Sequence, residues 1–197
     1  MLIAKAANSC QYLSAKIYGA SLILLFTVSF CYHLAEYIPF NTMTLNLCHR
    51  MDRAMIYVFI SANYYPWVLL LELPRDSWVT HLSWGIWVLA FLGITYQQIF
   101  HEKYKLIEVT LYLIVGALPG LVLQHTIDEV EGFIEMAIGG LLYIVGVGFF
   151  RSDGKIPFAH AIWHVHVVAA STCHFYAVHR YLLGRTNLPE GLHCQSI

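Results

Sequence analysis

The chain has 197 residues, of which 58% are hydrophobic and only 12% are charged, and its mean hydropathy is +0.60. A soluble domain carries about 25% charged residues, so this composition predicts an integral membrane protein. The formal net charge of −1 excludes a broad basic face for nucleic acid, and we recognise no nucleic-acid-binding module. The five cysteines are odd in number and lack C-x-x-C spacing, so they do not predict a disulfide framework.

About 20 apolar residues are needed to cross the hydrocarbon core of a bilayer. The hydrophobic pattern therefore predicts six transmembrane helices, over residues 13–35, 53–73, 79–100, 105–125, 131–150 and 158–182. Their connections are short, and no linker or internal repeat is evident. We expect an all-α fold in which residues 1–185 form a single transmembrane helical domain and residues 186–197 form a short polar tail.

The first two predicted spans carry polar side chains near the ends that meet. Ser29 and His33 lie four residues apart at the end of span 1, on one helical face. Asp52 is expected in the first turn of span 2, which also contains Pro66, where a kink is expected. Asp52, followed by Arg53, has a plainer interpretation as a helix-start carboxylate beside a cytosolic anchor.

Spans 3 to 5 contain fewer candidates for chemistry. Glu108 and Glu135 lie near span ends, where snorkelling or pairing explains them more simply than proton transport does. Pro119 is expected to kink span 4. Span 5 has a stripe of small residues suited to close helix contact, at Gly139, Gly140, Gly146 and Gly148.

Span 6 carries the strongest signal, His160 and His164 within FAHAIWHVHVVAA. Ionisable side chains at membrane depth are costly and are functional-site hypotheses by default. An i, i+4 pair projects from one helical face and suits two ligands of one metal ion. We interpret His166, His174 and His179 as structural residues, because they lie on a different face, deeper in the span or toward its far end.

Alternation of the spans brings these residues together. The end of span 1 and the starts of spans 2 and 6 must lie on the same membrane face, so Ser29, His33, Asp52, His160 and His164 can share one depth. The loops after spans 1, 3 and 5 hold six of the Lys and Arg residues, against five elsewhere. The positive-inside tendency therefore places these loops in the cytosol and both termini on the lumenal or extracellular side.

Three neutral imidazoles with an open fourth position describe a catalytic zinc site. His33, His160 and His164 would be the ligands, Asp52 would hold or deprotonate the attacking water, and Ser29 would hydrogen-bond the water or a reacting carbonyl. Hydrogen-bonded packing histidines and haem ligands remain alternatives. A transporter has little support, because no chain of ionisable residues crosses the full depth.

Four segments carry a specific resemblance: SFCYH at 29–33, MDRAMIYVFISANYYPW at 51–67, FHEKYKLIEVTLYL at 100–113 and FFRSDGKIPFAHAIWH at 149–164. They resemble the progestin and adipoQ receptor (hemolysin III-like) family, and most closely its branch of monocyte to macrophage differentiation factors. The resemblance implies a seven-helix membrane bundle with zinc near the cytosolic face, and the six spans here would correspond to helices 2–7. It implies His33, His160 and His164 as ligands, with Asp52 and Ser29 beside them.

The resemblance leaves two functions open. The one that the branch resemblance favours is a multi-pass receptor that modulates kinase-linked signalling and engages cytosolic proteins. The alternative, which the chemistry of the site permits, is a zinc-dependent amidase acting on ceramide-like lipids. Membrane lipids, including a ceramide-like or free fatty acid ligand, are the expected partners. We expect a location in the Golgi, late endosome or lysosome, or in the plasma membrane.

Overall fold

The computed structural model of the chain describes residues 1–38, 40–71, 73, 78–101, 103–126 and 131–185. Within them, every regular element is helical. In chain order the elements are α1 (Leu2–Lys5), α2 (Ser9–Tyr37), α3 (Thr42–Leu70), the 3₁₀ turn η1 (Trp78–His81), α4 (Leu82–Ile99), α5 (Lys105–Thr126), α6 (Phe133–Arg151), α7 (Ala159–Ala177) and the π-helical turn η2 (Val178–Leu182). The expected all-α fold is confirmed.

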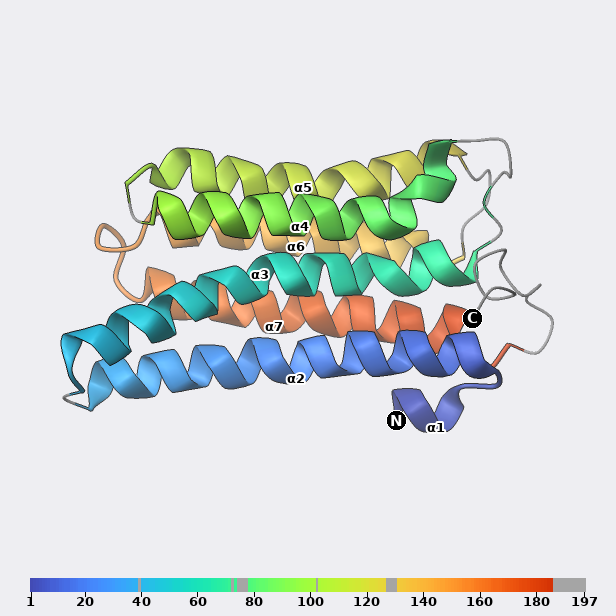
Figure 1. Cartoon of the computed structure of the whole chain (residues 1–197), viewed down its shortest axis with the longest axis horizontal. Helices are drawn as coiled ribbons and strands as arrows, with labels where there is room; N and C mark the ends of the chain where they lie inside the picture. The colour runs from blue at the N-terminus through green and yellow to red at the C-terminus, as the bar shows by residue number, and fades with distance from the viewer. Residues whose placement is uncertain (39, 72, 74–77, 102, 127–130, 186–197) are drawn as a thin grey trace.

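The six long helices, α2 to α7, run side by side and alternate in direction (Figure 1). The end of α2 and the starts of α3, α5 and α7 therefore lie together at one end of the bundle, on the left in Figure 1. We call this the ligand end, because it carries the candidate residues. The helices α2 and α3 pack along each other, as do α6 and α7. Trp67 and Tyr18 are fully buried in the core between the helices.

Asparagine side chains fix the starts of the two longest helices. The side chain of Asn8 accepts a hydrogen bond from the backbone N–H of Gln11 at 2.9 Å, and Asn41 accepts one from Thr44 at 2.8 Å. Such caps satisfy backbone donors that a helix start otherwise leaves unpaired. Each helix has 29 residues and is about 44 Å long at 1.5 Å per residue, which exceeds the hydrocarbon thickness of about 30 Å.

One predicted boundary is wrong. The sequence placed the start of the second span at residue 53, but α3 begins at Thr42, so Asp52 lies in the interior of the helix and not in its first turn. The polar stretch before Asp52 lowers the hydropathy without breaking the helix, because its residues tolerate helical geometry and Asn41 caps the new start. The helix simply continues beyond the apolar segment.

Four helical segments are long and apolar enough to cross a membrane: Ser9–Tyr37, Val79–Ile99, Lys105–Thr126 and Phe133–Arg151. Among the described helices, α3 and α7 are the two long ones outside this set. These are the helices that carry Asp52, His160 and His164, so the polar residues that create the candidate site are part of what lowers their apolarity. These helices support an integral membrane protein.

The glycines of α6 serve two different surfaces. A Cβ atom at Gly139 would lie 2.4 Å from Cδ2 of His174, and one at Gly146 would lie 2.8 Å from Cβ of His166, so α7 packs directly against both positions. A Cβ atom at Gly140 or Gly148 would meet nothing within 4 Å. Close helix contact is therefore confirmed for half of the predicted stripe.

Among the described cysteines, Cys10 is disulfide-bonded, whereas Cys31, Cys48 and Cys173 are free. The predicted polar tail, 186–197, lies outside the described residues.

Candidate metal centre

Three imidazoles converge at the ligand end of the bundle. His33 comes from the last turns of α2, and His160 and His164 come from the first two turns of α7. Nε2 of His33 lies 3.0 Å from Nε2 of His164 and 3.4 Å from Nε2 of His160. One ligand atom from each residue lies within 4.8 Å of the others, and all three side chains are half-buried.

This arrangement fits a single metal ion. Zinc binds imidazole nitrogen at about 2.0–2.1 Å, so two nitrogens on one ion lie no more than about 4 Å apart. The two Nε2 separations from His33 meet this limit. The ligand nitrogens of His160 and His164 lie within 4.8 Å of each other, so at most a small inward movement would bring this pair within the limit too. Three convergent nitrogens favour one ion over haem, whose iron takes two ligands from opposite faces of a flat ring.

Carboxylates stand behind two of the three imidazoles. Nδ1 of His33 lies 3.4 Å from Oε2 of Glu36, and Nδ1 of His160 lies 3.3 Å from Oδ2 of Asp153. A carboxylate that accepts from one ring nitrogen fixes the tautomer and directs the lone pair of the other nitrogen toward a metal. The outward Nδ1 and inward Nε2 atoms of His33 and His160 follow this pattern.

Asp52 and Ser29 lie beside the histidines. The Ser29 side chain lies beside the Asp52 carboxylate, and that carboxylate is close enough to His33 and His160 to interact with both electrostatically. The structure therefore brings together all five residues that the sequence singled out, although Asp52 arrives from the interior of α3 and not from its first turn.

The triad opens on a polar cavity of about 520 Å³, which we call the chamber. Its wall contains acids, bases and histidines from five helices and one connection. The ionisable members other than tyrosine are His33, Glu36, His49, Asp52, Arg53, Lys105, Arg151, Asp153, His160 and His164. Charges of both signs thus face a space large enough for a polar group and its water.

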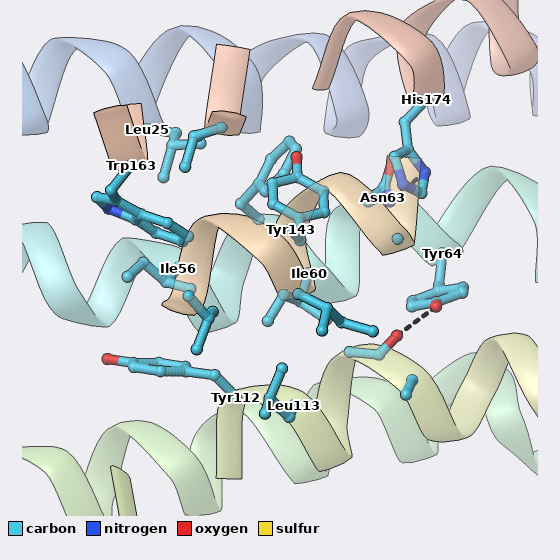
Figure 2. A pocket seen from close by; sticks show the side chains of 17 residues that line it. Leu25, Ile56, Ile60, Asn63, Tyr64, Tyr112, Leu113, Tyr143, Trp163 and His174 are labelled. Carbon is cyan, nitrogen blue, oxygen red and sulfur yellow. Dashed lines mark hydrogen bonds between the residues drawn. The ribbon is translucent and has the colours of Figure 1, made fainter. Parts of the chain in front are cut away.

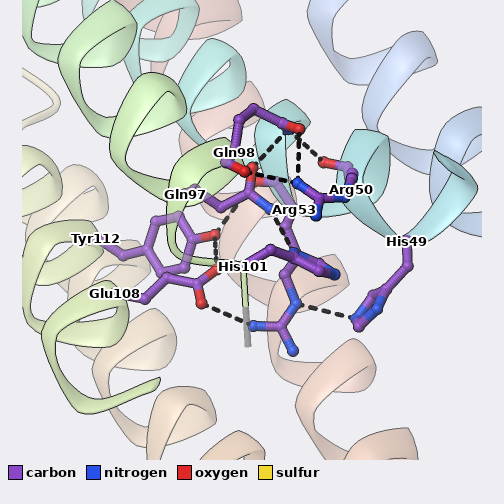
Figure 3. Close-up of polar contacts among 8 residues, drawn as sticks. All are labelled: His49, Arg50, Arg53, Gln97, Gln98, His101, Glu108 and Tyr112. Carbon is purple, nitrogen blue, oxygen red and sulfur yellow. Dashed lines mark hydrogen bonds and ion pairs between the residues drawn. The ribbon is translucent and has the colours of Figure 1, made fainter. Parts of the chain in front are cut away.

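A buried ion pair supports the chamber wall between α3 and α5 (Figure 3). Arg53 Nη1 lies 3.2 Å from Oε2 of Glu108, and the Tyr112 hydroxyl donates to Oε1 of Glu108 at 2.9 Å. The Arg53 Nε–H donates to Nε2 of His49 at 3.1 Å. Glu108 is only 3% exposed, so pairing, and not snorkelling, is the interpretation that holds for this residue.

A second, apolar cavity of about 140 Å³ adjoins the chamber. Ile56, Tyr112 and Trp163 line both spaces and form the partition between them. Ala117 on α5 and Ile144 on α6 line the apolar cavity and are exposed on the outer surface of the bundle. The cavity therefore borders the region where lipid would lie.

Sequence reasoning missed several residues of this region. Glu36 follows His33 by three residues on the same helix, so its spacing could have shown it. Asp153 lies in the connection before α7, where no helical spacing applies, and the Arg53–Glu108 pair joins helices far apart in the sequence. His166, predicted to pack, places Nδ1 2.8 Å from the backbone oxygen of Ile162.

Comparison with known proteins identifies relatives over nearly the whole chain. Residues 1–175 match the family model described as haemolysin-III related. The chain is 43% identical to the monocyte to macrophage differentiation factor of Homo sapiens over 184 residues, which cover 92% of this chain and 76% of that protein. It is 32% identical to a hemolysin-3 homolog of Bacillus subtilis (strain 168), over 90% of this chain and 82% of the relative.

A hemolysin-3 of Bacillus cereus is 29% identical over 91% of this chain and 80% of its own length. No solved structure matches the chain. The four apolar helices agree with a membrane protein of this kind. The matched family model and the relatives together show that the chain belongs to the haemolysin-III-related family, which includes the progestin and adipoQ receptors.

Proposed function

We propose that this chain is a six-span membrane protein that holds zinc through His33, His160 and His164 and hydrolyses the amide bond of a lipid at that site. The observation that carries the proposal is the convergence of three imidazole nitrogens and a carboxylate in one polar chamber. The chamber lies directly beside an apolar cavity. A lipid amide has the matching form, with a polar reacting group attached to an apolar chain.

Zinc at this position would act as a Lewis acid that activates water and polarises a carbonyl. Asp52 would hold the attacking water and accept its proton. Ser29, which lies beside that carboxylate, would orient it, and Glu36 and Asp153 would orient the imidazoles of His33 and His160. The side chains that would perform these tasks all lie around the three histidines.

The two cavities provide for the two parts of a lipid substrate. The polar head would occupy the chamber, and the acyl chain would pass Trp163 and Tyr112 into the apolar cavity. Entry from the bilayer between α5 and α6 is favoured by the exposed cavity-lining residues Ala117 and Ile144. The substrate would thus reach the site without leaving the membrane.

The six long helices are proposed as six spans, with the ligand end facing the cytosol. The helices α3 and α7 would cross the bilayer despite their polar residues, because Asp52, Asn63, His160, His164 and His174 line the chamber and the apolar cavity. A Golgi, late endosomal, lysosomal or plasma membrane location is compatible with this topology.

A second function is favoured by the human relative, whose name refers to the differentiation of monocytes to macrophages. In this alternative the chain is a receptor that modulates kinase-linked signalling, zinc is structural, and cytosolic proteins bind the loops at the ligand end. The metal ligands are the same in both proposals, but only the hydrolase requires Asp52 for its output.

The test uses purified protein, with zinc content measured together with fatty-acid release from ceramide. We expect His164→Ala to lose zinc and activity, because one of three ligands is removed. Asp52→Asn should keep zinc and lose at least about 100-fold in rate, as expected for removal of a general base. His166→Ala is the matched control, since this histidine lies on the same helix but turns its Nδ1 to a backbone oxygen.

The results separate the two functions. A parent protein that binds zinc without releasing fatty acid, and whose signalling in cells survives Asp52→Asn, would reject the hydrolase and retain the receptor. Protein that retains His33, His160 and His164 but binds no zinc would reject both.

A further inference from the structure

Two polar side chains that contact each other lie in the wall of the apolar cavity, Asn63 on α3 and His174 on α7 (Figure 2). The two side chains are 5% and 3% exposed, respectively, and Nδ2 of Asn63 lies 2.9 Å from Nδ1 of His174. Around them the cavity wall is largely aliphatic and aromatic, with Leu25, Ile60 and Val167 among its members. The pair thus adds an amide and an imidazole to a wall whose other polar side-chain groups are mainly tyrosine hydroxyls.

Each member of the pair keeps one polar atom without a partner. Among the described residues, Oδ1 of Asn63 and Nε2 of His174 have no hydrogen-bond partner although both atoms are buried. Buried polar groups in folded proteins are nearly always hydrogen-bonded, because leaving one unpaired is costly. The hydroxyl of Tyr143, whose ring contacts that of His174, is a third buried polar atom without a partner among the described residues. Such atoms on neighbouring cavity-lining residues point to a polar group supplied by a ligand.

The hydrogen bond between the two side chains determines what that ligand group must be. If the Asn63 amide donates to Nδ1 of His174, a neutral imidazole carries its proton on Nε2, which leaves one donor there and one acceptor at Oδ1. If the amide is rotated by 180°, the Nδ1–H of His174 donates to the Asn63 oxygen instead. The remaining groups are then an acceptor at Nε2 of His174 and a donor at the amide nitrogen of Asn63. A hydroxyl matches either case because it donates one hydrogen bond and accepts another, whereas a carboxylate or carbonyl only accepts.

The position of the pair is set by two helices that start at the ligand end. His174 follows His164 by ten residues on α7, which corresponds to about 15 Å at 1.5 Å per residue. Asn63 follows Asp52 by eleven residues on α3, so this helix places the pair at a similar depth. A lipid with its head in the chamber would therefore bring a mid-chain group, and not its reacting group, to the pair.

We propose that Asn63 and His174 form a recognition site for a hydroxyl on the acyl chain of the bound lipid, so that the protein selects mid-chain hydroxylated lipids over unsubstituted ones. The proposal rests on the proposed function, in which a lipid places its head in the chamber. Its chemistry is independent of zinc, because neither side chain belongs to the metal centre. Selection would arise from the two hydrogen bonds that an unsubstituted chain leaves unmade.

The experiment measures equilibrium binding of stearic acid and 12-hydroxystearic acid to the purified full chain in lipid nanodiscs. We expect the wild-type protein to bind the hydroxylated acid about tenfold more tightly, as two hydrogen bonds of ordinary net strength would give. Asn63→Leu should keep binding of stearic acid and abolish the preference. Ser61→Ala is the matched control, because this buried hydroxyl on the same helix donates to the backbone oxygen of Ile86 and is not part of the cavity wall.

The comparison of the two acids on the wild-type protein needs no variant, so it decides the proposal even if Asn63→Leu fails to fold. Equal affinity for both acids would overturn the hydroxyl site and leave the proposed function standing. A preference that persists in Asn63→Leu would also overturn it. Failure of the wild-type protein to bind either acid would overturn both this inference and the lipid-binding function on which it rests.

Discussion

Glu36 and Asp153 show how much of a metal site depends on residues that never touch the metal. Each lies 3.3–3.4 Å from the outward ring nitrogen of a triad histidine, Glu36 with His33 and Asp153 with His160. Both carboxylates are more than half exposed, so their effect on the stability of the fold is small. Their effect on the direction and basicity of the imidazole nitrogens is the larger one.

We therefore expect Glu36→Gln and Asp153→Asn each to lower zinc affinity by about 10- to 100-fold without unfolding the protein, as loss of a ligand-orienting group does elsewhere. Competition with a fluorescent zinc chelator would measure the change. Glu131→Gln is the control, because this acid pairs with Arg185 at the opposite end of the bundle. Unchanged affinity in both ligand-end variants would show that the carboxylates do not orient the histidines.

At the same scale, the contacts of His174 could not be predicted from its position in the sequence alone. The sequence predicted a structural role, because the residue lies deep in span 6 and away from the triad. Its pairing with Asn63 and its unpartnered Nε2 became visible only when α3 and α7 were placed side by side. The triad was accessible from sequence because two of its members share one helical face, whereas Asn63 and His174 are 111 residues apart.

At the level of elements, α6 shows that a run of small residues does not by itself tell which of them pack against a neighbouring helix. Gly139 and Gly146 face α7 closely, while Gly140 and Gly148 face open space, and the sequence alone assigned all four to one stripe. A helix has several faces, and glycines adjacent in sequence point to different ones. Which face meets a neighbour depends on the rotation of the helix, and residue spacing does not supply that rotation.

This difference gives a paired prediction. Gly146→Ala should destabilise the protein by about 1–3 kcal/mol, the usual range for overpacking, because the new methyl group would lie 2.8 Å from Cβ of His166 and 2.9 Å from Cε3 of Trp163. Gly148→Ala should leave stability unchanged or raise it slightly, since alanine favours helix and the site is open. Thermal unfolding in detergent would measure both, and equal effects would show that α6 and α7 are not packed this way.

The sequence predicted some helix boundaries well and one of them poorly. The apolar pattern predicted the existence and order of the long helices α2 to α7, and it located the starts of α5 and α7 within a residue. It misplaced the start of α3 by eleven residues, because hydropathy marks the hydrocarbon layer while Asn41 and its cap decide where the helix begins. The interior position of Asp52 was therefore beyond the reach of the pattern.

For the whole molecule, alternation of helices was the most productive argument from sequence. Consecutive long helices run in opposite directions in the structure, as the sequence predicted (Figure 1). An error of several residues at a helix boundary does not change which ends of the helices lie together, so His33, Asp52, His160 and His164 were correctly predicted to converge despite the wrong start of α3. Cavities, by contrast, depend on side-chain volume across several helices, and no sequence pattern predicted the partition at Trp163.

The proposed topology predicts which positions face the cytosol. In a background with Cys31, Cys48 and Cys173 changed to serine, Lys155→Cys at the ligand end should react with a membrane-impermeant maleimide only from the cytosolic side. His125→Cys, near the end of α5 at the opposite end of the bundle, should react only from the other side. Both residues are exposed. Labelling of the two positions from the same side would reject six spans in this arrangement.

The origin of the three imidazoles has a mechanical consequence. His33 and His164 are separated by 131 residues. A cation bound by both would therefore cross-link α2 and α7, the first and last long helices, and close the chain between them into a loop. The cross-link would hold α2 and α7 together, so the metal-bound protein would have to open between other helices to admit a lipid. The helices α5 and α6 carry none of the three histidines, so we expect the bundle to open between these two helices.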